Sequence, residues 1–163
     1  MWTQDQPTFR GRYYTIEDAF CQPRPEPAPP IMIGGGGRKR TLRIAARYAD
    51  WWNVPGAPPE EYADLLGVLR EHCAAVGRDY ETLVKSWASD CVAVAPTHAE
   101  AERLAQASPF YSARSAIVGT PDEVAAQLRR YVDLGVSQFM LRFADFPSTA
   151  GGELFVRAVI PQF

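Results

Sequence analysis

Short apolar runs alternate with segments of helical periodicity from residue 31 to the end of the chain. No hairpin turn motif connects any two of these runs, so each pair of consecutive strands needs a helical crossover and lies parallel. The pattern predicts an α/β fold with a parallel sheet, and it fits both an open sheet and part of a barrel. The predicted strands are 31–33, 50–54, 83–95 and 136–143, and the predicted helices are 38–49, 60–77, 97–107, 119–135 and 151–160.

Most of the predicted helices begin with the residues that helix starts favour. Thr120 and Glu123 have the spacing of a capping box, and Pro121 takes the first helical position between them. Thr97 and Glu100 repeat that spacing one helix earlier. Acidic side chains are favoured here because the amino end of a helix carries partial positive charge.

One predicted helix start departs from this rule. Four glycines follow the first strand, Gly34, Gly35, Gly36 and Gly37, and they lead into the cations of 38–40, which we place in the first turn of the helix. Glycines let backbone N–H groups approach an anion closely, and a helix start adds positive potential. The combination predicts a site for a phosphate or another anion. A flexible turn with solvated cations is the alternative.

Two common phosphate loops do not fit the glycine run. A dinucleotide-binding G-x-G-x-x-G motif would need glycine in place of Lys39, and the residues that follow the run do not have the G-K-[ST] ending of a P-loop. The two histidines, His72 and His98, are isolated and do not form a metal motif, so we expect structural or surface roles for them.

Composition narrows the class of protein. The chain has 163 residues, 47% of them hydrophobic, and a net charge of -2, which does not suggest a nucleic-acid partner. No apolar run reaches the roughly 18 residues of a membrane span, and the first residues do not resemble a signal peptide. The cysteines Cys21, Cys73 and Cys91 form no C-x-x-C pair. We therefore expect a cytoplasmic protein.

The stretch "PPIMIGGGGRKRTLRIAARYADWWNV" closely resembles the luciferase-like monooxygenase family of flavin- or deazaflavin-dependent (β/α)8-barrel oxidoreductases. The similarity extends upstream through "FRGRYYTIEDAFCQPRP" and downstream through "VGTPDEVAAQLRRYVDLGVSQFMLRFADFP". Within the family, the chain is most similar to the branch predicted to use coenzyme F420, and FMN is the second choice of cofactor.

The resemblance also implies a binding site. The amides of Gly34 to Gly37 would bind the cofactor phosphate, and Asn53 and Val54 at the end of the next strand would complete that wall. Arg38 and Lys39 could reach the phosphate or the polyglutamate tail of a deazaflavin coenzyme.

The chain departs from the family in its number of strands. A complete barrel has eight strands in about 250 residues, whereas this sequence predicts four. The resemblance makes residues 31–163 the carboxyl-terminal half-barrel, strands five to eight, behind a proline-rich irregular lead-in at 1–30. The family's other half supplies most catalytic contacts, so we predict no catalytic residue here. We expect a homo-oligomer or a partner chain that completes the barrel. A non-catalytic cofactor-binding module and an inactive truncated remnant are the alternatives.

Two further sets of side chains have competing interpretations. Arg142 shares a strand face with Met140, and it could pair with Asp90 or Asp145, which we favour, or meet a substrate at the barrel mouth. The tryptophans could stack on a flat cofactor ring, although packing in the core is the commoner role; these are Trp51, Trp52 and Trp87.

Overall fold

The structure is a computed structural model that describes residues 2–163 and separates them into two units, with the boundary after Ile31. The first unit contains a small antiparallel hairpin of β1 (Phe9–Arg10) and β2 (Thr15–Ile16). The amide of Gly11 donates to the Tyr14 carbonyl at 2.9 Å and closes its turn. Sequence patterns did not predict this hairpin, because strands of two residues are too short to show alternation.

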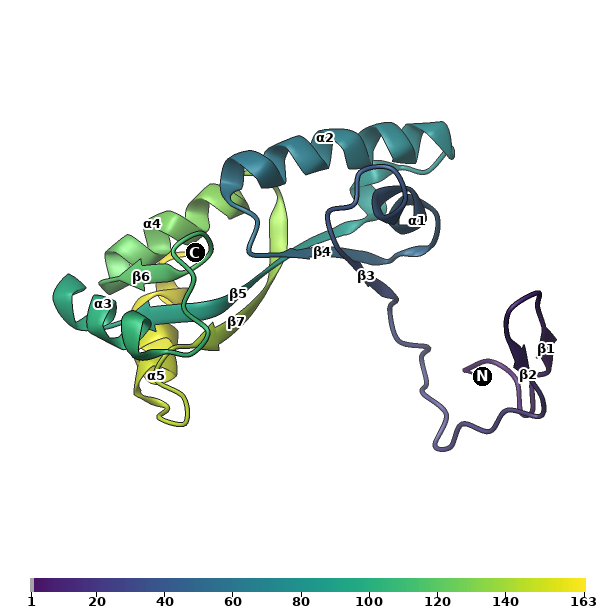
Figure 1. The fold of residues 1–163 in the computed structure, drawn as a ribbon, viewed down its shortest axis with the longest axis horizontal. Helices are drawn as coiled ribbons and strands as arrows, with labels where there is room; N and C mark the ends of the chain where they lie inside the picture. Colours follow the sequence, from purple (N-terminus) through teal and green to yellow (C-terminus); the bar gives the residue numbers. More distant parts are fainter. Residues whose placement is uncertain (1) are drawn as a thin grey trace. The chain divides into compact units, whose positions relative to one another are not determined.

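The second unit, Met32–Phe163, is built on one parallel sheet (Figure 1). Its strand order is β3-β4-β5-β6, and β7 also pairs with β5. Val92 of β5 pairs with both Ile117 and Phe143, so β6 and β7 lie on opposite edges of β5. The strands are β3 (Met32–Gly34), β4 (Trp51–Pro55), β5 (Val84–Val94), β6 (Ile117–Gly119) and β7 (Val136–Phe143).

Helices connect the strands, and Figure 1 shows α2 and α4 on the same side of the sheet. Together with the parallel pairing, this confirms the predicted α/β fold. The helices are α1 (Thr41–Tyr48), α2 (Pro59–Ala75), α3 (His98–Ala107), α4 (Pro121–Val132) and α5 (Ala150–Ala158), with 3-10 turns η1 (Tyr80–Thr82) and η2 (Ile160–Gln162).

The four predicted strands correspond to β3, β4, β5 and β7, and the short strand β6 was missed. Its three residues lie directly before the capping box of α4, where Thr120 and Glu123 cap each other as predicted. A strand this short has no visible periodicity, so only pairing with β5 defines it.

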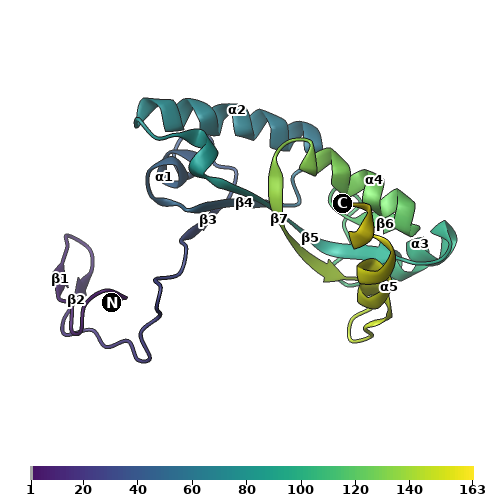
Figure 2. The ribbon, with the colours of Figure 1, turned by 180° about the vertical axis from the view of Figure 1, so that it is seen from behind.

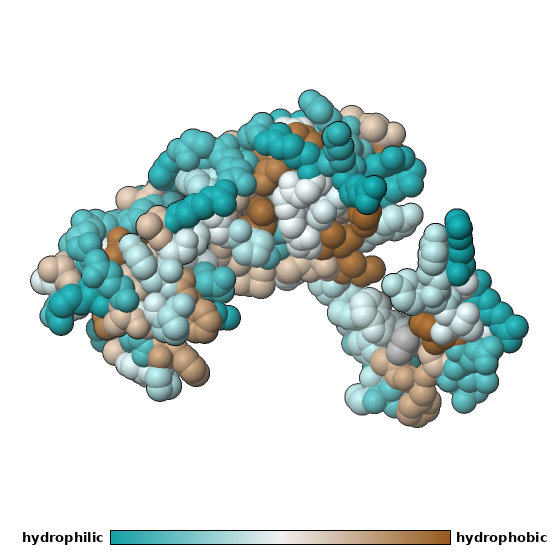
Figure 3. All heavy atoms as spheres, in the orientation of Figure 1, coloured by the Kyte–Doolittle hydropathy of each residue, from teal (hydrophilic) through white to brown (hydrophobic). Residues whose placement is uncertain are grey.

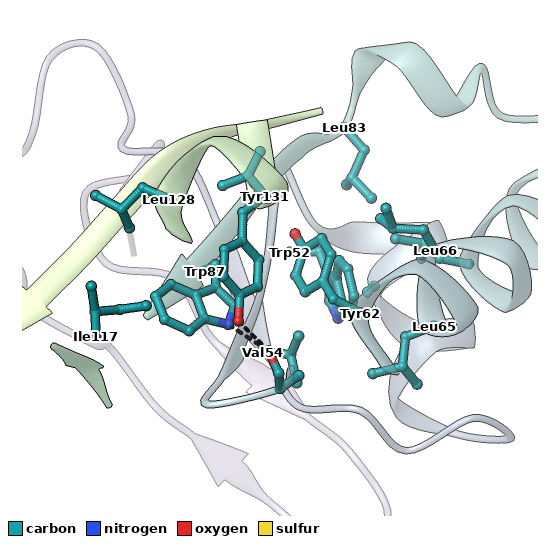
Figure 4. Close-up of a cluster of buried hydrophobic side chains, with 14 of the residues drawn as sticks. Trp52, Val54, Tyr62, Leu65, Leu66, Leu83, Trp87, Ile117, Leu128 and Tyr131 are labelled. Carbon is teal, nitrogen blue, oxygen red and sulfur yellow. Dashed lines mark hydrogen bonds between the residues drawn. The ribbon is translucent and has the colours of Figure 1, made fainter. Parts of the chain in front are cut away.

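Aromatic side chains form the centre of the core between the sheet and the helices (Figure 4). Trp87 stacks on Tyr131 with ring centroids 4.2 Å apart, and Trp52 lies 5.2 Å from Tyr62. The Trp87 indole and the Tyr131 hydroxyl both donate to the carbonyl of Ala57, at 2.9 and 3.0 Å. Trp52 and Trp87 are fully buried in this cluster, so cofactor-ring stacking is ruled out for both, and they pack the core.

The two outer strands of the sheet expose apolar residues. We expected the first strand to be covered on both faces, but β3 is an edge strand, and its Met32 is 38% exposed. Figure 2 shows β7 running beside β5 at the other edge, and within residues 2–163 it pairs with β5 alone. Figure 3 shows apolar side chains at the surface of each unit.

Candidate functional site

The glycine turn leaves the end of β3 and is partly integrated into the sheet. Gly35 has a φ of +115°, which favours glycine. Its amide donates to the Asn53 carbonyl at 2.8 Å, and its carbonyl accepts from the Trp52 indole at 3.1 Å. The Gly35 amide is therefore engaged by the protein itself.

Gly36 and Gly37 allow close packing, and their amides donate no hydrogen bond within residues 2–163. A Cβ at Gly36 would lie 3.1 Å from a methyl group of Leu65, and one at Gly37 would lie 2.6 Å from the Thr41 hydroxyl oxygen. Within residues 2–163, no group accepts a hydrogen bond from the N–H of Gly36 or Gly37. These two amides can bind an anion, as helix-start and nest amides do.

The cations of residues 38–40 precede α1, so their predicted place in its first turn was wrong. The helix begins at Thr41, and the Ile44 amide donates to the Arg40 carbonyl at 2.9 Å. The Leu42 amide reaches back to Gly37 at 3.1 Å, which closes a wider turn before the regular helix. Arg38 and Lys39 thus belong to the glycine turn, and Arg40 is the N-cap of α1, so a cation still lies at the positive end of the helix dipole.

Helix α2 holds this turn from outside the sheet. Arg38 forms an ion pair with Asp64, and the ring Nε2 of His72 lies 2.7 Å from the Arg38 carbonyl oxygen. The bond to Arg38 lowers the pKa of Asp64, and the bond to Asp64 raises the pKa of Arg38. Sequence analysis missed Asp64 because ordinary exposed helix acids look the same. The His72 contact agrees with the structural role expected for it.

Lys39 differs from Arg38 in having a free charge. Its side chain is exposed, and within residues 2–163 it has no ion-pair partner. Arg40 is likewise exposed and without an ion-pair partner in the described chain, so an incoming anion can contact Lys39 or Arg40 without displacing a carboxylate.

Asn53 and Val54, which were predicted to complete the wall of the phosphate site, lie on opposite faces of β4. Asn53 is aligned with Gly34 on one side and with Ser86 on the other, and its Oδ1 accepts from the Ser86 hydroxyl at 3.3 Å. This bond leaves the amide nitrogen of Asn53 as a donor. Val54 is buried in the helix-side core, where its side chain packs near Gly36, so only its backbone can contribute to the wall.

The site therefore offers hydrogen-bond donors at the carboxyl end of β3 and, within residues 2–163, two cations without an ion-pair partner, Lys39 and Arg40. Ligands of parallel α/β folds gather at this end of the strands. The donor set fits a phosphate group. It does not fit a metal ion, and within residues 2–163 no group of three or more His, Cys, Asp or Glu side chains could hold one.

Comparison with known proteins assigns the chain to a family. A family model described as luciferase-like monooxygenase matches residues 1–115, well over half of the chain. The chain belongs to this family.

Several relatives have names that specify coenzyme F420. The chain is 32% identical to an F420-dependent glucose-6-phosphate dehydrogenase of Microbacterium testaceum over 83% of its own length. It is 31% identical to the enzyme of that name from Nakamurella multipartita over 99% of its length. An FMNH(2)-dependent dimethylsulfone monooxygenase of Pseudomonas putida is 25% identical over 99% of the chain.

Solved structures show the same fold. An F420-dependent secondary alcohol dehydrogenase superimposes on 98% of the chain with a TM-score of 0.76 at 18% identity. The coenzyme F420 dependent tetrahydromethanopterin reductase of Methanopyrus kandleri superimposes on 98% of the chain with a TM-score of 0.77 at 17% identity. These luciferase-like TIM-barrel neighbours agree with the parallel α/β fold.

The chain spans about half the length of the proteins it matches. It covers 48% and 56% of the two dehydrogenases, and 57% and 58% of the two solved structures. In the described part of the chain, no helix has the length and apolar character needed to cross a membrane.

Proposed function

We propose that this chain supplies the cofactor-phosphate site of an oxidoreductase that uses coenzyme F420 or FMN. The observation that carries the proposal is the turn at the end of β3, where the free amides of Gly36 and Gly37 are followed two residues later by the exposed, unpaired cation of Lys39. A phosphate satisfies all three groups at once. When bound, either cofactor supplies hydride transfer, and flavins also activate oxygen.

Coenzyme F420 is our first choice. The two dehydrogenases described above are 32% and 31% identical and are both named as F420-dependent, whereas the FMNH(2)-dependent enzyme of Pseudomonas putida is 25% identical. Lys39 is exposed, and Arg38 is half exposed beside Asp64; we propose that both also contact the polyglutamate tail of this coenzyme.

We further propose that the chain is the carboxyl-terminal half of a barrel, strands five to eight, with four β/α units in residues 31–163 behind the lead-in 1–30. The open edges of β3 and β7 and the half-length coverage of relatives support this proposal. A partner chain then supplies the other strands and the catalytic groups, or a homo-oligomer of this chain completes the barrel. The enzyme acts on a small-molecule substrate, and we propose a cytoplasmic location.

A non-catalytic cofactor-binding module is the second candidate function. The chain holds the donors for a phosphate, but the described residues place no acid–base pair next to them. This candidate predicts cofactor binding without turnover.

A titration with each cofactor tests the proposal. The chain is titrated separately with coenzyme F420 and with FMN, and absorbance and thermal stability are followed. We expect binding that weakens about tenfold in Lys39→Ala, a typical loss for one charge-assisted contact. Arg38→Ala should weaken it less, because Asp64 already occupies that guanidinium.

The control variant is Arg47→Ala, which removes an equal charge from the last turn of α1. It should leave binding unchanged. Equal affinity of the wild type and Lys39→Ala for both cofactors would contradict the proposed site. Binding with substrate-dependent reduction supports the enzyme, and binding alone supports the module.

A further inference from the structure

A charged cluster lies at the carboxyl end of β7, on the face of the sheet away from the core. Phe139, Leu141 and Phe143 pack against the helix-side core. Because strand side chains alternate, Met140 and Arg142 lie on the opposite face, as the sequence predicted.

Arg142 has two neighbours there. Its Nη1 lies 3.5 Å from the Asp90 carboxylate, which confirms the favoured pairing, and its guanidinium carbon lies 4.1 Å from the centre of the Phe110 ring. Asp90 comes from β5 and Phe110 from the loop after α3, so three separate segments converge on one guanidinium.

This arrangement leaves most of the guanidinium available. The Arg142 side chain is 48% exposed, and within residues 2–163 Asp90 is its one hydrogen-bonding or ionic partner. An exposed ion pair contributes little to stability. Arginine carries five N–H donors in a planar fork that matches an oxyanion, and Phe110 and Asp90 restrict how that fork can turn.

The surroundings of Arg142 add a preference for apolar groups. Arg142 and Phe110 line a groove of about 1390 Å³ along β7 and α5. The groove extends to both faces of β7: Phe139, Leu141 and Phe143 line it from the helix side, and Phe146 and Val156 are exposed apolar side chains that also line it. The other strand residues on the same sheet face as Arg142 carry no positive charge within the described chain; among them are Asn53, Ser86, Gln138 and Met140.

We infer that Arg142 binds the anionic group of an organic substrate, a phosphate, sulfonate or carboxylate attached to an apolar body. The inference rests on the proposed function, because it places substrate recognition at the same carboxyl ends of the strands as the cofactor turn. Arg142 makes the contact with the anion. Asp90 and Phe110 are positioning residues that hold the guanidinium plane.

Calorimetric titration of the full chain with phenyl phosphate, benzoate and benzyl alcohol tests the inference. We expect Arg142→Gln to bind the two anions at least tenfold more weakly than the wild type, with benzyl alcohol unaffected. Arg142→Lys keeps the charge but loses the fork, so it should have intermediate affinity. Arg157→Gln is the matched control, because Arg157 lines the same groove without these neighbours, and it should bind as the wild type does.

Two outcomes would overturn the inference: equal anion affinity in the wild type and Arg142→Gln, or the same loss in Arg157→Gln. Circular dichroism establishes that each variant is folded, and Arg142→Lys provides the comparison if Arg142→Gln is not.

Titration with the cofactors separates this inference from the proposed function. Arg142→Gln should keep the wild-type affinity for the cofactor, and Lys39→Ala should keep the Arg142-dependent binding of phenyl phosphate. A chain that binds neither cofactor but still binds the anions through Arg142 would overturn the proposed function alone.

Discussion

Arg38 and Asp64 form an ion pair that connects the glycine turn to α2. Both side chains are about half exposed, so the pair itself adds little to stability. Its larger effect is on the turn, because the Asp64 carboxylate occupies a guanidinium that an anion at Gly36 and Gly37 would otherwise attract.

Replacing Asp64 should therefore change anion binding. In Asp64→Asn we expect the cofactor to bind about two- to fivefold more tightly at low salt, because a competing negative charge is lost, and the gain should disappear in concentrated salt. Cofactor titrations at both salt concentrations measure this. Asp133→Asn, at the end of α4, controls for net charge and should show no gain. Unchanged or weaker binding in Asp64→Asn would refute the competition.

Gly36 should not tolerate a side chain. Its Cβ would lie 3.1 Å from Leu65 and 3.6 Å from Val54, so Gly36→Val forces the turn away from α2. We expect a loss of about 1–3 kcal/mol in the free energy of unfolding, as overpacking usually causes, together with weaker cofactor binding.

The control for Gly36 is Gly67, an exposed helix residue with no atom within 4 Å of an added Cβ. Gly67→Ala should raise stability by up to about 1 kcal/mol, since alanine favours helix. Urea unfolding of both variants measures the two effects. A Gly36→Val protein as stable as the wild type would show that the turn can move freely.

The Tyr131 hydroxyl should contribute to stability through its bond to the Ala57 carbonyl. Burial raises the pKa of Tyr131 to about 12, so the hydroxyl remains a donor throughout the neutral range. Tyr131→Phe should cost about 1 kcal/mol, the usual value of one hydrogen bond. Trp87 still donates to the same oxygen, which limits the loss. Tyr48→Phe, at an exposed position, should change urea unfolding by less than about 0.5 kcal/mol.

The contact between His98 and Glu123 should make stability depend on pH. Their side chains meet at 3.0 Å, and the bond to Glu123 raises the pKa of His98 above its ordinary 6.5. The backbone bond from Thr120, followed by the bond from His98, lowers the pKa of Glu123 below 4.5.

The signs of these shifts define a pH window. The contribution of His98 to folding stability is complete below pH 6.5 and is lost as pH rises through its raised pKa. The contribution of Glu123 to folding stability is present above pH 4.5 and is lost as pH falls through its lowered pKa. His98→Gln should therefore melt slightly below the wild type between these pH values and equally at alkaline pH. Melting curves across pH test this, and a constant difference would contradict it.

Much of the fold could be predicted from the sequence. Apolar runs without hairpin motifs imply parallel strands, and the cap of α4 at Thr120 and Glu123 formed as its spacing predicted. Several of the shortest elements could not be predicted, although the three-residue strand β3 was. The strands β1, β2 and β6 have two or three residues each and show no periodicity; β1 and β2 are defined by pairing with each other across a short turn, and β6 by pairing with the distant strand β5.

For the candidate site, the sequence alone determined where the glycines and cations stand and which family they resemble. Only the tertiary structure decided which of them are available to a ligand. The Gly35 amide donates to the Asn53 carbonyl, and the Arg38 guanidinium pairs with Asp64. Within residues 2–163, the amides of Gly36 and Gly37 and the ammonium of Lys39 have no such partner. The physical reason is that a donor's partner is chosen by distance in space, and β4 and α2 reach this turn only after the chain has folded.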